Sequence, residues 1–276
     1  MYEENNDHVV YFLWFIFYFL LYWLILGANA ISFLIVFAVY FLFLLFALSP
    51  IAEELWRKMS GVRPLRLKQE KDRLLPLFYE VYRGVYQENR KLSKSIKLYI
   101  KEDMDVNAFA FGRGTLVLTR GSIDLLSDDG LKGLIAHEFG HFTNKDTTAA
   151  LFMIIGNFIM SVLVNTFYNI KKSLEKETKK SIIISCLKAP FDVIYFILRG
   201  IQFIGDLILM YISRKHEYMA DYFALKSGFG KELADVLTEI YLSSIRKPQS
   251  IKEQLKSSHP HITIRIERLE EQIYQA

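Results

Sequence analysis

Cysteine is almost absent from this sequence, since Cys186 is the only one among 276 residues. A single cysteine cannot close an internal disulfide and offers no cluster of thiolates for a metal, so we expect Cys186 to be a small buried apolar residue. Charge is also scarce, at 23% of the residues, and the net charge of +4 is too small to indicate binding to nucleic acid. The chain has neither an internal repeat nor a low-complexity linker.

Two long stretches lack charge altogether: Val9–Leu26, with eighteen residues, and Ala30–Leu48, with nineteen. As a helix, each is long enough to cross a hydrocarbon core of about 30 Å. Neither resembles a cleaved signal peptide, because the leader Tyr2–His8 is acidic and no small-residue cleavage site precedes the second stretch. Only a tight turn, Gly27-Ala28-Asn29, separates them. The sequence therefore predicts an integral membrane protein with a transmembrane hairpin over residues 1–50.

Basic residues cluster directly after this hairpin. They are Arg57, Lys58, Arg63, Arg66, Lys68, Lys71 and Arg73. Loops rich in lysine and arginine stay on the cytoplasmic side of a membrane. We therefore expect a multi-pass protein of the cell (inner or plasma) membrane, with both ends of the hairpin in the cytoplasm.

Two further apolar segments, Ala149–Ile170 and Ile182–Ile212, are also long enough to span. The second has charges spaced along one helix face, at Lys188, Asp192, Arg199 and Asp206. The same face continues to Ser213 and Glu217, so we expect one helix to run from the membrane into the catalytic region. Each of the four charges in the apolar segment would cost roughly 2.5–3.5 kcal/mol at mid-bilayer, so they either neutralise one another in a bundle or line a substrate path. Lysines between the two segments oppose the positive-inside rule. The inserted hairpin 149–212 therefore either spans the bilayer or lies in its cytoplasmic interface.

The remaining residues, 51–148 and 213–276, are polar enough to form a cytoplasmic domain. Apolar periodicity predicts helices over Leu67–Leu92, Gly121–Leu126, Asp129–Thr143, Ser213–Ser227, Lys231–Ile245 and His261–Tyr274. Strands are predicted at Ile96–Ile100, Val106–Phe111 and Thr115–Thr119, the last two forming a hairpin around Gly112-Arg113-Gly114. The fold class is therefore mainly α with a small β-sheet, in a polytopic membrane protein.

The motif His137-Glu138-Phe139-Gly140-His141 lies in the predicted helix Asp129–Thr143. Residues four apart share a helix face, so both imidazoles can reach one metal ion. Glu138 lies about 100° round the helix from His137, close enough to bond a water on that ion. A catalytic zinc has three protein ligands, with imidazole nitrogens at about 2.0–2.1 Å. The motif therefore predicts a zinc site that needs a third ligand from elsewhere.

Glu217 is the best candidate for the third ligand. Asp221 follows one helical turn later and faces the same way, which suits a carboxylate that accepts the second N–H of a ligating histidine. His216 is the rival ligand, but it points about 100° away from Glu217 and lacks such a supporting carboxylate. Alternatively, Glu217 and Asp221 are two solvated charges on a surface helix.

Together, His137-Glu138-x-x-His141 and Ser213-Arg214-x-x-Glu217-x-x-Ala220-Asp221 resemble the HtpX and CAAX prenyl protease family of membrane zinc metallopeptidases. Asn107-Ala108-Phe109-Ala110 resembles that family's N-A-F-A segment, and His259-Pro260 followed by Arg265 resembles its H-P…R element. The match runs in order from about Leu67 to Leu269, and the two N-terminal spans and the short chain favour HtpX. Two departures are Phe139-Gly140, where Leu-Ser is more usual, and His261, where a second proline is common.

The resemblance implies a zincin-like (gluzincin) catalytic domain that faces the cytoplasm. It implies an endopeptidase that acts on membrane or misfolded proteins in quality control, or on a specific precursor peptide. One Zn²⁺ per chain would be held by His137, His141 and Glu217, with Asp221 behind a histidine. Glu138 would act as the general base.

Residues outside the metal motif have roles that depend more on the resemblance. The segment formed by Asn107, Ala108, Phe109 and Ala110 would offer a strand edge to an extended polypeptide, which would bind by backbone hydrogen bonds. Asn107 is either an anchor for substrate backbone or a turn residue at a strand start. By resemblance, His259 and Arg265 would stabilise the developing oxyanion. By spacing alone they are a histidine beside a helix and a surface arginine.

Two functions of other classes stay open at this stage. A catalytically silent, metal-bound membrane scaffold would bind partner chains, but it would have no need of a general base at Glu138. A transporter would use the charged face of the segment Ile182–Ile212 and would need a continuous path through the bilayer. The partners that we expect are an extended polypeptide and the lipid bilayer.

Overall fold

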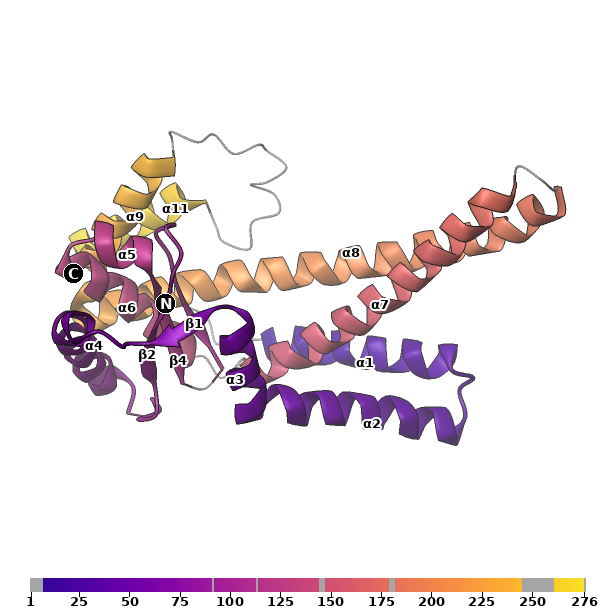
Figure 1. Ribbon diagram of the computed structural model, residues 1–276, viewed down its shortest axis with the longest axis horizontal. Coiled ribbons are helices and arrows are strands. Elements are labelled where there is room, and N and C mark those ends of the chain that lie inside the picture. Colours follow the sequence, from indigo (N-terminus) through magenta and orange to yellow (C-terminus); the bar gives the residue numbers. More distant parts are fainter. Residues whose placement is uncertain are drawn as a thin grey trace. The chain divides into compact units, whose positions relative to one another are not determined.

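A computed structural model describes residues 7–90, 92–112, 114–143, 147–178, 182–244 and 261–275. These residues are mainly helical with one small mixed sheet, which confirms the predicted fold class (Figure 1). The chain forms two compact units, one of Met1–Ala47 with Asp146–Ile212 and one of Leu48–Lys145 with Ser213–Ala276. We call them the span unit and the sheet unit.

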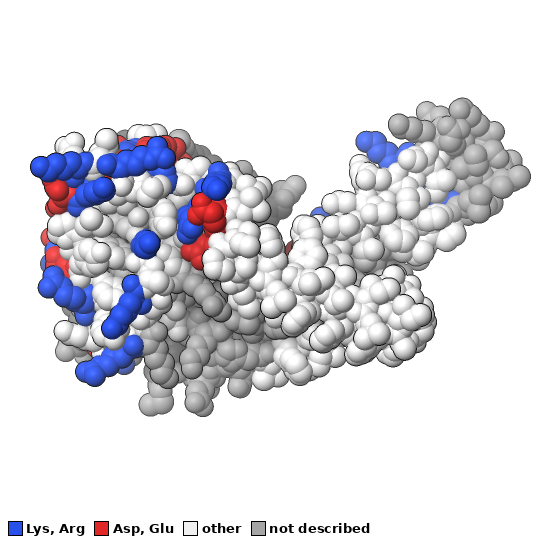
Figure 2. All heavy atoms as spheres, turned by 60° about the horizontal axis from the view of Figure 1, so that its bottom comes forward, with Lys and Arg blue, Asp and Glu red and all other residues white. Residues whose placement is uncertain are grey.

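The span unit contains α1 (Asp7–Ile25), α2 (Ala30–Ala47), α7 (Thr147–Thr178) and the first part of α8 (Ile182–Ala224). Three ranges of the described residues are long and apolar enough to cross a membrane, Ala30–Ala47, Met153–Glu175 and Lys188–Leu242, and Val9–Ile25 is a shorter apolar helix. Most large side chains of α2 are exposed, as expected of a lipid-facing surface. On the face shown in Figure 2, few charged side chains interrupt the surface of the span unit.

Inside the span unit, the polar side chains bond to one another. The Tyr18 hydroxyl donates to Asn157 Oδ1 at 2.5 Å, and Asn157 Nδ2 donates to Asp206 Oδ1 at 3.2 Å. The Tyr22 hydroxyl donates to the carbonyl of Gly156 at 2.7 Å. A Cβ at position 156 would lie only 2.4 Å from the Tyr18 ring, so this position has no room for a side chain. Small residues thus let the helices approach closely enough to form these bonds.

The charges predicted along one face of α8 have separate partners. Lys171 and Lys188 lie 3.3 and 3.5 Å from the Asp192 carboxylate, and Lys188 also lies 3.0 Å from Glu175. Asp206 is bonded to Asn157 instead. Lys188 and Asp192 therefore pair along α8, and Lys171, Glu175 and Asn157 of α7 supply the other partners.

The sheet unit begins with α3 (Pro50–Met59), β1 (Val62–Pro64), α4 (Lys68–Glu88), β2 (Lys97–Lys101), β3 (Ala108–Phe111) and β4 (Thr115–Thr119). It continues with α5 (Arg120–Leu125), α6 (Asp128–Thr143), the end of α8, α9 (Gly230–Ser244) and α11 (Ile262–Gln275). The sequence predicted most of these within a few residues. It did not predict α3 or β1.

The strands are ordered β1-β2-β4-β3. β2 pairs with β1 antiparallel and with β4 parallel, and β3 forms the predicted antiparallel hairpin with β4. Among the described residues, β3 therefore has a strand on one side only. No strand of the described residues lies along its other edge, and α6 packs against this strand.

One hydrophobic core joins α4, the sheet, α6, α9 and α11. α6 packs closely against α9 at Gly133. A Cβ there would lie 2.5 Å from the backbone of Leu233, so only glycine fits without a shift of the two helices. The predicted continuation of the apolar segment into the catalytic region is confirmed, because α8 is continuous to Ala224, and a π-helical turn, Leu225–Phe229, joins it to α9. Gly228 closes that turn with φ of 86°, a conformation that favours glycine. The shared core therefore holds α6 beside the end of α8.

Candidate metal centre

The metal motif lies on a helix that is buried over most of its length. Asp128 and Asp129 occupy the first turn of α6, and Ser127 Oγ accepts a hydrogen bond from the backbone N–H of Gly130 at 3.0 Å. Such groups satisfy and stabilise a helix N-terminus. Residues from Gly130 to Gly140 are buried apart from Lys132, so the core fixes the helix and the directions in which its side chains project.

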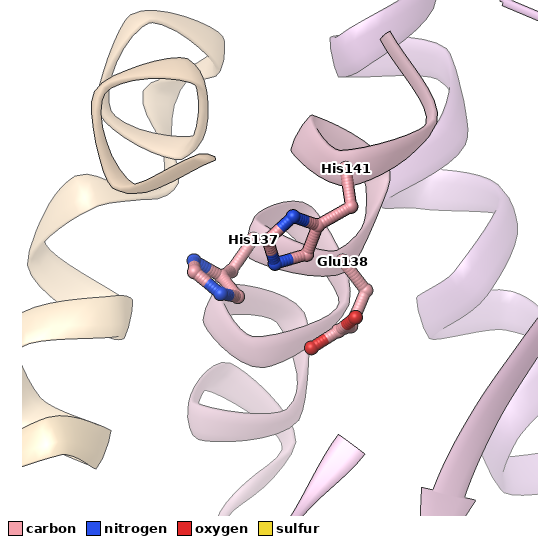
Figure 3. A group of neighbouring side chains, drawn as sticks. All are labelled: His137, Glu138 and His141. Atoms are coloured by element: carbon pink, nitrogen blue, oxygen red, sulfur yellow. The ribbon is translucent and has the colours of Figure 1, made fainter. Parts of the chain in front are cut away.

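His137, Glu138 and His141 project from α6 to a common space (Figure 3). Their potential ligand atoms all lie within 4.8 Å of one another. The two imidazole rings are 4.9 Å apart and nearly perpendicular. His137 and Glu138 are each only 4% exposed, whereas the His141 side chain is 27% exposed. The cluster is therefore buried behind His137 and opens to the outside near His141.

Glu217, on α8, lies opposite both histidines as the sequence predicted. One carboxylate oxygen is 3.5 Å from His137 Nε2, and the other is 3.6 Å from His141 Nε2. Ligand atoms bound at about 2.0–2.1 Å to a tetrahedral zinc are roughly 3.3–3.5 Å apart. Two imidazole nitrogens and a carboxylate also form a donor set that zinc accepts. The residues present therefore fit a zinc ion.

A second layer of contacts holds these groups from behind. Asp221 Oδ1 is 2.9 Å from His137 Nδ1, the nitrogen that faces away from Glu217. Arg265, on α11, donates to both oxygens of Asp221, at 2.8 Å from Nε and 2.6 Å from NH2. Its NH1 group is 3.0 Å from Glu217. Arg265 thus joins the two carboxylates of α8 and leaves one face of Glu217 for the histidines.

The electrostatics of this cluster favour a positive charge between His137 and Glu217. Burial lowers the pKa of His137, but hydrogen bonds to Asp221 and Glu217 outweigh this effect and raise the pKa to about 10. Burial and the charge on His137 lower the pKa of His141 to about 3. Burial opposes the ionisation of Asp221, yet Arg265 and His137 hold the pKa of this carboxyl below its usual range. The neighbouring carboxylates therefore stabilise a positive charge at His137, whereas His141 is neutral near neutral pH.

Glu138 lies beside the histidines but bonds in another direction. Burial raises the pKa of its carboxyl to about 7, and the charge on His137 opposes that shift. A hydrogen bond from the backbone N–H of Ala110 also stabilises the carboxylate. Ala110 belongs to β3, so Glu138 lies where the metal cluster and the edge strand meet. A carboxyl with a pKa near neutrality can both accept and return a proton.

Asn107 lies directly before β3, where its side chain bonds to the next residue and its backbone bonds to β4 and α5. Its side-chain Oδ1 accepts from the backbone N–H of Ala108 at 2.9 Å. Its backbone N–H donates to Thr119 Oγ1 at 3.0 Å and to Ser122 Oγ at 2.8 Å. The structure therefore gives Asn107 the turn contact, and the predicted contact with a substrate stays a prediction.

The other sequence candidates are placed as follows. Arg265 is 7% exposed and bonded to Asp221 and Glu217, so it is not the surface arginine that spacing alone predicted. Its predicted contact with an oxyanion stays a prediction, and His259 lies outside the described residues. Sequence reasoning missed the close approach of Gly140 to Ala220, where a Cβ would lie 2.7 Å from the Ala220 Cα. Both are small residues directly before a site residue, and that pattern was the available signal.

Comparisons with known proteins agree with this geometry. The pattern of Peptidase family M48 matches residues 82–273, which include all the candidate ligands. A protease HtpX homolog from Dictyoglomus thermophilum is 29% identical over 245 residues, covering 79% of this chain and 75% of the relative. A protease HtpX homolog from Listeria monocytogenes is 32% identical over 208 residues, covering 63% and 67%.

Two more comparisons extend the similarity along the chain. A protease HtpX homolog from Dictyoglomus turgidum is 28% identical over 306 aligned positions, covering 96% of this chain and 92% of the relative. The crystal structure of S. mikatae Ste24p is similar with a TM-score of 0.53 and 17% identity. That similarity covers 92% of this chain and 61% of the Ste24p chain, and it indicates a shared fold.

Proposed function

Because this chain belongs to peptidase family M48, with HtpX-like proteases among its relatives, we propose that it is an endopeptidase of membrane or misfolded proteins. Its general role would be quality control, or else the maturation of a specific precursor peptide. The single observation that carries the proposal is the convergence of His137 Nε2, His141 Nε2 and the Glu217 carboxylate beside Glu138.

One zinc ion per chain would be held by His137, His141 and Glu217. When bound, zinc polarises a scissile carbonyl and lowers the pKa of a water to about 7. Asp221 would hold a proton on His137 Nδ1, so that Nε2 is the nitrogen that gives up its proton to bind the metal. Arg265 holds Asp221 and Glu217 in place through its three nitrogens.

Glu138 supplies the proton transfer. Its carboxylate accepts a proton from the attacking water and returns it to the amine of the leaving group, a role typically worth about 10²–10⁴ in rate. Burial keeps the pKa of Glu138 near 7, which matches both halves of that task. The Ala110 N–H, which bonds to the carboxylate, directs it toward β3.

The substrate would be a polypeptide in extended conformation. The open edge of β3 (Ala108–Phe111) supports this arrangement, because a strand with one neighbour can bond a second chain through its backbone. Such binding would align a peptide bond of the substrate with Glu138, and it would depend little on the side chains of the substrate. We expect the catalytic residues to lie in the cytoplasm, since the basic residues after α2 favour that side of a cell membrane.

The test is digestion of unfolded casein by the detergent-purified protein loaded with zinc, beside the Glu138→Gln variant. We expect cleavage by the first and none by the second, with equal zinc bound to both. A Glu138→Gln variant that cleaves as fast as the wild type would refute the assignment of the base. An active wild type and a silent variant would also separate an enzyme from a metal-bound scaffold.

A further inference from the structure

Helix α3 (Pro50–Met59) packs on the sheet with one of its faces only. The Trp56 ring stacks on Phe111 of β3, with ring centroids 4.0 Å apart. Thr115 of β4 donates to Glu53 at 2.5 Å and accepts from Arg57 at 2.8 Å. Stacking and partly buried polar contacts of this kind fix the rotation of the helix about its axis.

The opposite face of α3 is apolar and exposed. Ile51, Leu55 and Met59 are 71%, 46% and 79% exposed. At about 100° per residue they span an arc of about 80°, and Lys58, with a 73% exposed side chain, falls at the edge of this arc beside Ile51. An apolar stripe with a long basic side chain at its edge is typical of helices that lie in a membrane interface.

The chain itself places this face close to a bilayer. The candidate span α2 ends at Ala47, and α3 begins at Pro50 after Ser49, whose Oγ accepts from the backbone N–H of Ala52 at 3.2 Å. Three residues extend at most about 10 Å. The polar headgroup layer adds roughly 5–7 Å on each side of the hydrocarbon core. The start of α3 therefore lies in or directly beside that layer.

We propose that α3 is an interfacial helix that binds the phospholipid surface of the bilayer that α2 crosses. Ile51, Leu55 and Met59 insert between the lipids, and Lys58 reaches the phosphate groups. Two faces of one short helix then bind two different partners, the sheet through Trp56 and the lipid through the apolar arc.

This contact has a consequence for the edge strand, which rests on the proposed function. Because Trp56 stacks on Phe111, a helix fixed in the headgroup layer holds β3 near the membrane surface. Polypeptide segments close to the bilayer would then reach β3 more easily than free peptides would.

The lipid contact can be measured without peptidase activity. In a Glu138→Gln, Cys186→Ala background, a cysteine at Leu55 is labelled with an environment-sensitive NBD fluorophore and the protein is placed in phospholipid vesicles. A cysteine at Asp235, an exposed position of α9, is the matched control. We expect a blue-shifted emission at position 55 that lipids with a nitroxide high on the acyl chain quench, and neither effect at position 235. Equal emission and equal quenching at the two positions would overturn the proposal.

The consequence for substrates needs a second variant. Ile51→Ser, Leu55→Ser and Met59→Ser together change exposed side chains only, so the sheet unit should keep its fold. In active protein in vesicles, we expect a severalfold slower cleavage of a membrane-tethered peptide and an unchanged rate for the same peptide free in solution. If the ratio of the tethered-peptide rate to the free-peptide rate equals that of the wild type, the lipid contact of α3 does not favour substrates near the membrane. A wild type that cleaves neither peptide would contradict the proposed function, and the fluorescence result would still decide the lipid contact.

Discussion

Replacing Asp221 with asparagine should weaken zinc binding while the protein still folds. Asp221 accepts three hydrogen bonds, one from His137 Nδ1 at 2.9 Å and two from Arg265 at 2.8 and 2.6 Å. An asparagine has one oxygen and one NH2 group in place of the two oxygens. Its NH2 group would face a donor whichever way the amide turns, so at least one of the three bonds is lost.

The expected size of the effect follows from the contact with His137. Removing the hydrogen-bond partner of a ligating histidine typically costs about 10–100-fold in metal affinity, or about 1.4–2.7 kcal/mol. Arg265 keeps its contact with Glu217 at 3.0 Å, so its charge stays paired. We therefore expect Asp221→Asn to fold and to bind zinc more weakly.

The assay is competition for zinc against a chelator of known affinity, with thermal unfolding of the zinc-loaded protein as the measure of folding. Asp235→Asn, at an exposed position of α9, makes the same chemical change away from the site. Its zinc affinity should equal that of the wild type. If Asp221→Asn unfolds as the wild type does and binds zinc equally well, then Asp221 does not orient His137.

Three further predictions concern stability. Burial raises the pKa of Glu138 from 4.5 to about 7, so the metal-free folded state binds the proton more tightly than the unfolded state does and loses stability as the pH rises through this window. Glu138→Gln should therefore increase the free energy of unfolding of the metal-free protein at pH 8 by on the order of 3 kcal/mol, which raises its Tm. At pH 4 the substitution should change the Tm little. A constant difference in Tm between pH 4 and pH 8 would refute the burial argument. Gly133→Ala would bring a Cβ within 2.5 Å of the backbone of Leu233, so we expect a loss of about 1–3 kcal/mol in thermal unfolding. Gly200→Ala is its control, because nothing lies within 4 Å of the added Cβ there, and equal Tm values for the two variants would contradict the packing. Tyr18→Phe removes the 2.5 Å bond to Asn157 and should cost about 0.6–1.7 kcal/mol in detergent unfolding, whereas no change would mean that this bond adds nothing to the span unit.

Local spacing was enough to predict the metal helix. The motif predicted a helix over Asp129–Thr143, and α6 runs from Asp128 to Thr143. The four-residue spacing of His137 and His141 is itself a helical contact, so the geometry of that pair follows from the sequence. The hairpin of β3 and β4 was predicted for the same reason, because its turn joins neighbours in the chain.

Contacts between residues that are far apart in the chain could not be predicted from the sequence. β4 lies between β2 and β3, and β1 is a strand of only three residues, Val62–Pro64, which exists because β2 offers it an antiparallel edge. By contrast, the charged helix face that continues past Ile212 to Ser213 and Glu217 predicted a continuous helix, and α8 does continue to Ala224. Composition marks the boundary between environments, and it does not end a helix.

The role of Arg265 shows the same limit within the site. Forty-four positions separate Arg265 from Asp221 in the chain, and periodicity says nothing about a contact between α11 and α8. Spacing alone therefore made it a surface residue. Only the packing of α11 against α9 carries its guanidinium to the two carboxylates.

The zinc bound per chain in the wild type, Glu138→Gln and Glu217→Ala, measured beside casein cleavage by the same samples, tests the central claim most directly. We predict one zinc per chain in the wild type and in Glu138→Gln, with cleavage by the wild type alone. Glu217→Ala should bind zinc far more weakly, because it removes one of three ligands. A Glu217→Ala protein that binds zinc as tightly as the wild type, or a wild type that cleaves equally well without zinc, would contradict the account.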